Sequence, residues 1–310
     1  SSQKHFDSKI NKFGSKLSTP ASLAYFKSNP DYRQFTGKRR YPKLICNVIN
    51  GGKHTGYNVE LCEFMIIPKG ETVLENISIA SKVYLRLARI LGENDENTYV
   101  TGREGGFVTN FFDNKGIIKI INSAIEMEKV ECDIGIDVAA NNFCEKKGNS
   151  FFYRISNREM SSNELYEFYV DLIGEFNRIV YLEDPFHEDD IKAWKKLMKL
   201  SKNKKILVVA DDLTVSQRER IKYCEGCFNA IIIKPNQVGN VTDMFESIKE
   251  ARKQNAKIII SQRSGETDSN TISEISVNVG SDYLKAGAPA RERIIKYNHL
   301  IRMEQTEESK

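Results

Sequence analysis

The stretch from Ile179 to Val215 constrains the fold more than any other part of the chain. It contains two short apolar runs rich in β-branched residues, IVYLED and ILVVAD, separated by a segment with helical spacing. Neither run alternates polar and apolar residues, which indicates strands buried on both faces, as in a parallel sheet. Each run ends in acidic residues. A carboxylate at the C-terminal end of such a strand would lie at the mouth of a closed barrel, where barrel enzymes place their chemistry.

The same alternation of strand and helix continues through the second half of the chain. Besides the two runs already named, at 179–184 and 206–211, strand-like runs occur at 134–140, 230–234, 257–261 and 282–286. Helical segments are expected at about 162–176, 190–201, 215–225, 241–254, 267–279 and 291–305. Strand–helix alternation of this length predicts parallel βα units, and therefore an α/β fold.

Two earlier apolar runs differ from the rest because a short turn connects them. They are KLICNVIN and VELCEFMIIP, and the link between them begins Asn50-Gly51-Gly52, so we expect an antiparallel hairpin. Helices are predicted at 72–91 and 114–128 from the spacing of apolar residues. The hairpin and the later strands together supply the strands that a closed, TIM-like (β/α)8 barrel requires.

Composition excludes several classes of protein. The formal net charge of +4 is spread along the 310 residues, and we see no RNA-binding aromatic motif, so nucleic acid is not expected as a partner. No apolar run is long enough to cross a bilayer, and the N-terminus shows no signal peptide, so no membrane is expected as a partner. The 6 cysteines lack the spacing of a disulfide framework, and the lone C-x-x-C at 224–227 lacks the further ligands of a zinc site. Reduced thiols favour a cytoplasmic location.

The first forty residues have a different character from the rest. They are polar and basic, are interrupted by Gly14, Pro20 and Pro30, and do not look like an independent domain. We therefore expect residues 1–40 to be the end of a preceding domain and a linker, and residues 41–310 to form the barrel domain. The chain opens on Ser1 without an initiator methionine, which suggests a piece of a longer protein.

Polar residues recur at or just beyond the C-terminal ends of the later strands. They are Asp137, Glu183, Asp211, Lys234, Arg263 with Ser264, and Lys285. In a barrel these ends meet at one mouth. Crowded carboxylates suit Mg²⁺, because their oxygens are hard ligands and a cation relieves their mutual repulsion.

The basic residues of this set suggest the reaction. A lysine beside a metal and a second cation has a lowered pKa and can act as a base near neutral pH. An arginine with a neighbouring hydroxyl suits a phosphate dianion. Metal, base and phosphate clamp together indicate proton abstraction α to a carboxylate, with an enolate-like intermediate held by metal ions.

Several of these residues also have ordinary structural interpretations. Asp137 could form a loop, and Asp212 is expected to cap the following helix rather than to bind metal. Lys234 could extend to the surface, and His54 could be a loop residue after two glycines. Glu63 is harder to explain in this way, since a charge among apolar neighbours should be paired or functional.

A series of stretches, taken in order, resembles the enolase (phosphopyruvate hydratase) family from about Lys12 to Glu304. They are NVINGGKHTG, EFMIIP, REGGF, IGIDVAA, LEDPF, ADDLTV, IIIKPNQVGN, SQRSGETDSNTISEISV, LKAGAPAR and KYNHLIRMEQ. The resemblance implies an enolase-type barrel, Mg²⁺ as cofactor, and the lyase reaction that interconverts 2-phosphoglycerate and phosphoenolpyruvate in glycolysis and gluconeogenesis. The stretch FGSKLSTPASLAYF is similar to the end of the enolase N-terminal capping domain.

Carried onto the matching positions, the resemblance implies a role for each site residue. The ligands of the tighter Mg²⁺ would be Asp137, Glu183 and Asp211, and Ser264 would help to hold a second Mg²⁺. Lys234 would remove the C2 proton of 2-phosphoglycerate, and Glu104, with Glu63 beside it, would help the 3-hydroxyl to leave. The substrate contacts would come from His54, Glu63, Arg263, Ser264, Lys285 and Gln262.

Several positions depart from the family's pattern. The family's SHRSGE is SQRSGE here, so Gln262 replaces a histidine and cannot titrate near neutral pH. The family's GDEGG is GREGG, so Arg103 replaces an acid and should favour ionised Glu104. Cys62 and Pro235 stand where the family has glutamine and valine. The sequence also lacks the S-G-A-S-T-G loop that closes over the substrate, and it stops earlier than typical enolases.

The sequence leaves two main hypotheses about function. The first is a working enolase, which would usually be a homodimer when the capping domain is present. The second is a pseudo-enolase retained as a structural or scaffolding subunit of a larger assembly, which the departures at Gln262 and Arg103 favour. A related enzyme that acts on another acid is a weaker alternative, because the phosphate-clamp sequence RSGET is retained.

Overall fold

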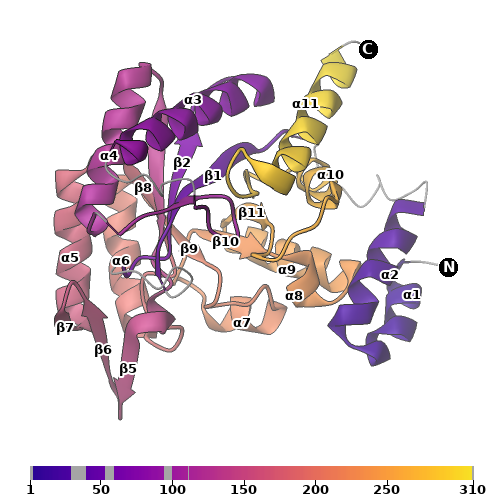
Figure 1. The fold of residues 1–310 in the computed structure, drawn as a ribbon. Coiled ribbons are helices and arrows are strands. Elements are labelled where there is room, and N and C mark those ends of the chain that lie inside the picture. Colours follow the sequence, from indigo (N-terminus) through magenta and orange to yellow (C-terminus); the bar gives the residue numbers. More distant parts are fainter. Residues whose placement is uncertain (1–2, 29–39, 53–58, 94–99, 111, 309–310) are drawn as a thin grey trace.

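The computed structural model describes residues 3–28, 40–52, 59–93, 100–110 and 112–308 of the chain (Figure 1). Its centre is a closed barrel whose strands follow the chain order. They are β1 (Lys43–Asn50), β2 (Glu63–Pro68), β4 (Cys132–Asp137), β8 (Ile179–Glu183), β9 (Leu207–Ala210), β10 (Ala230–Ile233), β11 (Lys257–Ser261) and β12 (Tyr283–Lys285). Pairing of β12 with β1 closes the barrel, and β3 (Phe107–Val108) pairs in parallel with Ile49 and Asn50 at the end of β1. The predicted α/β barrel is confirmed.

Strand β2 runs against both of its neighbours, whereas the other barrel strands pair in parallel. It is antiparallel to β1, as predicted for the hairpin, and also to β4. The first residue of β2, Glu63, therefore lies beside the last residue of β4, Asp137, which in turn lies beside Glu183 of β8. The reversed strand thus brings the beginning of β2 to the same end of the barrel as the C-terminal ends of its neighbours.

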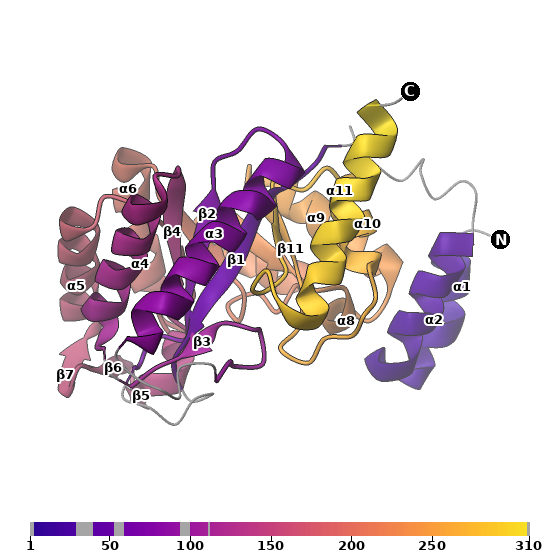
Figure 2. The ribbon, with the colours of Figure 1, turned by 45° about the horizontal axis from the view of Figure 1, so that its top comes forward.

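Helices cover the outside of the barrel (Figures 1 and 2). They are α3 (Val73–Gly92), α4 (Asn114–Glu128), α5 (Ser162–Glu175), α6 (Ile191–Lys204), α7 (Arg218–Tyr223), α9 (Val241–Lys253), α10 (Thr271–Asn278) and α11 (Ile294–Glu308). A capping box of Ser161 and Glu164 begins α5, and the Asn240 side chain caps α9 by accepting from the Asp243 N–H. No helix among the described residues is long and apolar enough to span a membrane.

Helix α7 begins later than the sequence predicts. The expected start at 215 is wrong, because Val215 and Ser216 have φ values of 48° and 56°, which are incompatible with a right-handed helix. A short helix, α8 (Pro235–Val238), directly follows β10 and was not predicted. Proline at its first position suits a helix start, since it has no N–H to leave unpaired.

A small antiparallel sheet between β4 and α5 was also missed. It consists of β5 (Cys144–Lys147), β6 (Ser150–Ile155) and β7 (Arg158–Ser161). The link between β6 and β7 is Ser156-Asn157, and both residues have positive φ, as in the two-residue turns that suit hairpins.

The N-terminal residues form a helical hairpin against the outside of the barrel. It consists of α1 (Gln3–Ile10), a 3₁₀ turn at Asn11–Phe13 and α2 (Ser15–Ser28), and it packs beside α8 and α9. The buried Asp7 carboxylate accepts from the Thr242 N–H at 2.9 Å and from the Thr242 hydroxyl at 2.6 Å. Ser18 donates to the carbonyl of Gly239 at 2.7 Å. The assignment of residues 1–40 to a preceding domain and linker stays a prediction.

Candidate active site

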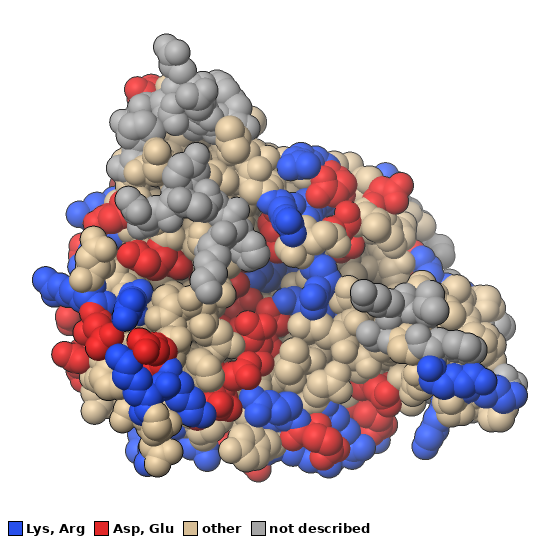
Figure 3. All heavy atoms as spheres, turned by 60° about the horizontal axis from the view of Figure 1, so that its bottom comes forward, with Lys and Arg blue, Asp and Glu red and all other residues tan. Residues whose placement is uncertain are grey.

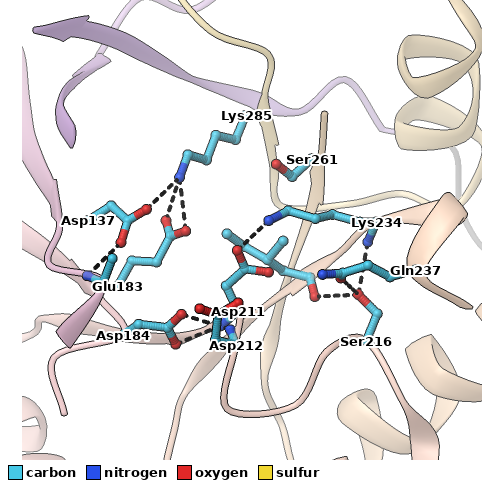
Figure 4. A network of polar contacts seen from close by, with 12 residues as sticks. Asp137, Glu183, Asp184, Asp211, Asp212, Ser216, Lys234, Gln237, Ser261 and Lys285 are labelled. Atoms are coloured by element: carbon cyan, nitrogen blue, oxygen red, sulfur yellow. Dashed lines mark hydrogen bonds and ion pairs between the residues drawn. The ribbon is translucent and has the colours of Figure 1, made fainter. Parts of the chain in front are cut away.

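The carboxyl-end mouth of the barrel carries a cluster of charged side chains. Figure 3 shows acidic and basic residues gathered around a hollow in this face, and Figure 4 shows the cluster from close by. At its centre is the buried Lys285, whose Nζ lies 2.8–2.9 Å from both oxygens of Glu183, 2.9 Å from Glu63 Oε2 and 3.6 Å from Asp137 Oδ2. The single ammonium group of Lys285 therefore forms ion pairs with three carboxylates.

The strand pattern explains why these side chains meet. Alternate residues of a strand point to the same face, and the inward face of this barrel is apolar below the mouth. Its apolar filling includes Ile45, Met65, Ile67, Tyr181, Val209, Ile232 and Ile259. At the next inward-facing position toward the mouth, β2 carries Glu63 and β8 carries Glu183. The corresponding positions just after β9 and β10 carry Asp211 and Lys234. The change from apolar to charged thus occurs at one level around much of the barrel.

Burial makes the charges of this cluster costly. Burial raises the pKa of Glu63, and the neighbouring Glu104 adds to that rise. Burial and Glu183 together raise the pKa of Asp137 well above its ordinary value. Burial opposes the charge of Lys285, yet Glu183, Glu63 and Asp137 hold its pKa well above the usual range. The positive charge of Lys285 therefore does not fully offset the cost of burying the carboxylates, whereas the carboxylates favour the protonated form of the lysine.

Lys234 lies across the mouth and pairs with Asp211. Its Nζ donates to Asp211 Oδ2, and its backbone N–H donates to Ser216 Oγ at 3.0 Å. The Ser216 hydroxyl in turn donates to Gln237 Oε1 at 3.0 Å. Burial works against the charge of Lys234, but Asp211 and Glu183 raise its pKa above the ordinary value. The lysine is therefore held as an ammonium ion by its carboxylate neighbours.

Asp184 anchors the loop that presents Asp211. Its two carboxylate oxygens accept from the backbone N–H groups of Asp211 at 3.0 Å and Asp212 at 2.7 Å. The expectation that Asp212 caps the next helix is wrong, because that helix begins at Arg218 after Gln217. Asp212 instead has its carboxylate within 4.8 Å of those of Asp184 and Asp211.

The donor set of the mouth fits a hard divalent cation such as Mg²⁺. Asp211 Oδ1 is buried and accepts no hydrogen bond from any residue that the structure describes. Ligand atoms within 4.8 Å of one another occur, in the described parts of the chain, in Cys62, Glu63 and Asp137 and in Asp184, Asp211 and Asp212. Of the predicted ligands, Glu183 and Asp137 contact Lys285, whereas Asp211 contacts Lys234. The mouth thus has more carboxylates than ammonium groups to neutralise them.

Glu104 approaches the cluster from the loop before β3. Its buried carboxylate accepts from Gln262 Nε2 at 2.8 Å, and its backbone carbonyl accepts from the Ala288 N–H at 2.9 Å. The close approach requires glycine at 287, because a Cβ there would lie 2.7 Å from the Glu104 carbonyl oxygen and 2.9 Å from Gln262 Nε2. The side chain of Arg103 is exposed.

The remaining predicted site residues lie at the rim or outside the described structure. Arg263 is exposed and Ser264 is half-buried, and both follow β11. Gln262 and Arg263 line a cavity of about 660 Å³ that also contacts Pro20 and Leu23 of α2. His54 lies outside the described residues. A second cavity, of about 750 Å³, lies by β6 and the starts of α5 and α6, and none of the predicted site residues lines it.

Sequence reasoning missed several residues that build the site. Asp184 was part of a recognised acidic pair, but its role as a loop anchor depends on its backbone, whose φ is 42°. Tyr181, whose hydroxyl donates to Glu183 Oε2 at 2.6 Å, was hidden in an apolar run. Arg293 is buried and donates to Gln262 Oε1, yet it follows Arg291 and Glu292 in a charged stretch with no signal of burial.

Comparison with known proteins agrees with this geometry. Residues 39–310 match the family model described as "Enolase, C-terminal TIM barrel domain". The chain is 41% identical over 271 residues to the enolase of Ehrlichia ruminantium (strain Gardel), covering 85% of this chain and 63% of the relative. It is 35% identical over 289 residues to the enolase of Methanosarcina mazei, covering 89% of this chain and 65% of the relative.

A further relative shows the same extent of match. The enolase of Anaplasma phagocytophilum (strain HZ) is 37% identical over 286 residues, which is 89% of this chain and 65% of that protein. The chain thus spans about two thirds of the length of these curated relatives, a little under that share in each case. The matched residues 39–310 are those that form the barrel and its charged mouth, and the chain belongs to the enolase family.

Proposed function

We propose that this chain carries the residues for the Mg²⁺-dependent, reversible dehydration of 2-phosphoglycerate to phosphoenolpyruvate. The observation that supports this most is the mouth itself, where acidic groups from several strands, two lysines and Glu104 converge. An arrangement of this kind offers a base, an acid and excess carboxylates for a cation within one buried cluster. The cytoplasm is the proposed location, which the unpaired state of Cys46, Cys62, Cys132, Cys144, Cys224 and Cys227 supports.

The proposed cation ligands are Asp137, Glu183 and Asp211, with Ser264 assisting a second ion. When bound there, Mg²⁺ would supply positive charge against a developing enolate and, by engaging Asp211, would lower the pKa of Lys234. The unpartnered Asp211 Oδ1 supports this assignment.

Lys234 is the proposed base for the C2 proton. Its ammonium group is positioned by Asp211, while the Ser216 hydroxyl fixes the backbone from which the lysine extends. Abstraction requires the neutral amine, so the lysine must first lose the proton that the Asp211 pair now stabilises. The pairing with Asp211 therefore holds Nζ in place and opposes the loss of its proton.

Glu104 is the proposed acid for the departing 3-hydroxyl, with Glu63 beside it. Gln262 donates an amide hydrogen to Glu104 Oε2 and so holds the carboxyl at the mouth. Lys285, buried among its three carboxylates, would contact the substrate carboxylate. The phosphate would lie at Arg263 and Ser264, and His54 would close over the substrate.

Steady-state conversion of 2-phosphoglycerate by the full protein with Mg²⁺ tests this proposal. We expect turnover in the unsubstituted protein and none above background in Lys234→Ala. Lys222→Ala is a matched control, because this lysine lies on α7 and pairs with the exposed Glu219, 3.6 Å away, so turnover should be unchanged. A folded protein whose turnover equals that of Lys234→Ala would contradict the proposal and favour a structural subunit of a larger assembly.

A further inference from the structure

Arg293 is a fully buried arginine between the candidate acid and the candidate phosphate loop. Its side chain is 1% exposed and lies just before α11. Nη1 donates to Gln262 Oε1 and to the carbonyl of Arg263 at 3.0 Å. Nη2 donates to the carbonyls of Arg103 at 2.7 Å and Ser264 at 2.9 Å. One guanidinium group thus joins the loop before β3 to the loop after β11.

The contact with Gln262 determines which way its amide faces. A guanidinium has only donors, so the atom that faces Arg293 must be the amide oxygen. The amide nitrogen is then directed to Glu104 Oε2, at 2.8 Å. Rotating the amide by half a turn would place two donors against Arg293 and an acceptor against the carboxylate, which loses both hydrogen bonds.

A lysine at position 293 could not make the same set of hydrogen bonds. The planar fork of an arginine reaches acceptors on two sides at once, whereas an ammonium group donates from a single point. A second buried cation, Lys296, donates to the carbonyl of Thr267 farther along the same loop. Two residues near the start of α11 therefore hold the loop after β11 by its backbone carbonyls.

We propose that Arg293 is a positioning residue. It fixes the orientation of the Gln262 amide toward Glu104, and it holds the backbone of Arg263 and Ser264 at a fixed position relative to that amide. The kinetic part of this proposal rests on the proposed function, whereas the orientation of the amide does not. Gln262 then keeps Glu104 at a fixed place through a neutral donor that does not titrate, and Arg293 supplies the geometry. The network links the proposed acid to the proposed phosphate loop through a side chain that is only 1% exposed.

Two measurements on the full protein test the proposal. The first follows the side-chain amide of Gln262 by NMR in ¹⁵N-glutamine-labelled protein without substrate, with Gln262→Ala to assign the signal. Arg293→Lys should shift both amide proton signals and speed their exchange with solvent. Arg291→Lys, an exposed arginine in the same turn, should leave them unchanged.

The second measurement is a double-mutant cycle on kcat and KM. We expect Arg293→Lys to lower kcat about 100-fold, the order expected when a catalytic group is misplaced by about 1 Å. In combination with Gln262→Ala the loss should be clearly smaller than the product of the two single losses, since both changes release Glu104. Arg291→Lys should keep both kcat and KM.

The outcomes separate this proposal from the proposed function. Unchanged Gln262 signals in folded Arg293→Lys, or fully multiplicative losses in the cycle, would overturn it. The predicted signal shifts in a protein with no turnover would instead support the geometry and contradict the proposed function. If Arg293→Lys does not fold, NMR of the Arg293 guanidinium in the unsubstituted protein still tests the proposal. Because all four Nη hydrogens are hydrogen-bonded, rotation of the guanidinium should be slow and the Nη protons should give separate signals. A single averaged signal would refute the proposal.

Discussion

Replacement of Lys285 by methionine should make the stability of the metal-free protein strongly dependent on pH. The side chain is 4% exposed, and it contacts Glu63, Asp137 and Glu183. Methionine keeps the apolar stem but removes the charge that three buried carboxylates share. Removing one partner of a buried ion pair costs about 3–5 kcal/mol, because the remaining charge stays buried without compensation.

The direction of the pH effect follows from the raised pKa values of the carboxyl groups. Burial already raises the pKa of Asp137 and Glu183, whereas Lys285 lowers the pKa of both, so its loss raises these pKa values further. A carboxyl whose pKa is higher in the folded than in the unfolded protein loses stability as pH rises through the folded value. The deficit of Lys285→Met should therefore be small near pH 5 and largest near pH 8.

Thermal unfolding in the presence of a chelator measures this difference. With an unfolding entropy of about 2.1 cal/mol/K per residue, a deficit of about 3–5 kcal/mol lowers Tm by roughly 5–8 °C at pH 8 in a chain of 310 residues. Lys222→Met, at an exposed pair on α7, should change Tm little at either pH. Equal deficits of Lys285→Met at pH 5 and pH 8, or no deficit at all, would refute the reasoning.

Three further predictions concern the cation, the tight loop and the N-terminal hairpin. Mg²⁺ at one hundred times its Kd should stabilise the folded protein by about 2.7 kcal/mol and so raise Tm. The rise in Tm should be larger at pH 8 than at pH 5, because the carboxylate ligands must be deprotonated, and an equal rise at both pH values would contradict this prediction. Gly287→Ala should abolish turnover and lower the free energy of unfolding, since its Cβ would lie 2.7 Å from the Glu104 carbonyl, whereas Gly226→Ala, with a similar positive φ but open space, should cost only about 1 kcal/mol. Asp7→Ala should lower the free energy of unfolding by about 1–3 kcal/mol in urea denaturation, because the Thr242 N–H and hydroxyl lose their buried acceptor, and an unchanged midpoint would contradict that role.

The sequence was sufficient for the barrel because its signals are local and repeated. Each apolar run specifies a strand, and the glycines after Asn50 predicted the antiparallel pairing of β1 with β2, although residues 51–62 form a longer connection than the predicted turn. That hairpin also explains how Glu63, at the beginning of its strand, reaches the mouth with residues from strand ends. The small sheet of β5, β6 and β7 was missed because two of its strands, β5 and β7, are short and carry mostly polar or charged residues.

The site was less predictable where a role depends on contacts between distant segments. Asp137, Glu183 and Asp211 were found from their places at strand ends, but their division between Lys285 and Lys234 depends on side-chain packing. Asp212 was assigned to a helix cap, yet positive φ values at Val215 and Ser216 delay that helix. The burial of Arg293 follows from its contacts with two loops, the one before β3 and the one after β11, which no spacing in the sequence records.

Exchange of the C2 hydrogen of 2-phosphoglycerate with solvent tests the central claim most directly. In D₂O with Mg²⁺, the full protein should introduce deuterium at C2. Lys234, the proposed base, would remove the C2 proton, exchange its ammonium hydrogens with the solvent and return a deuteron. Lys234→Ala should show no exchange, whereas Glu104→Gln should retain exchange while losing dehydration, since base and acid are separate groups. Exchange that persists in Lys234→Ala would contradict the assignment of the base, and its absence from the unsubstituted, folded protein would contradict the account as a whole.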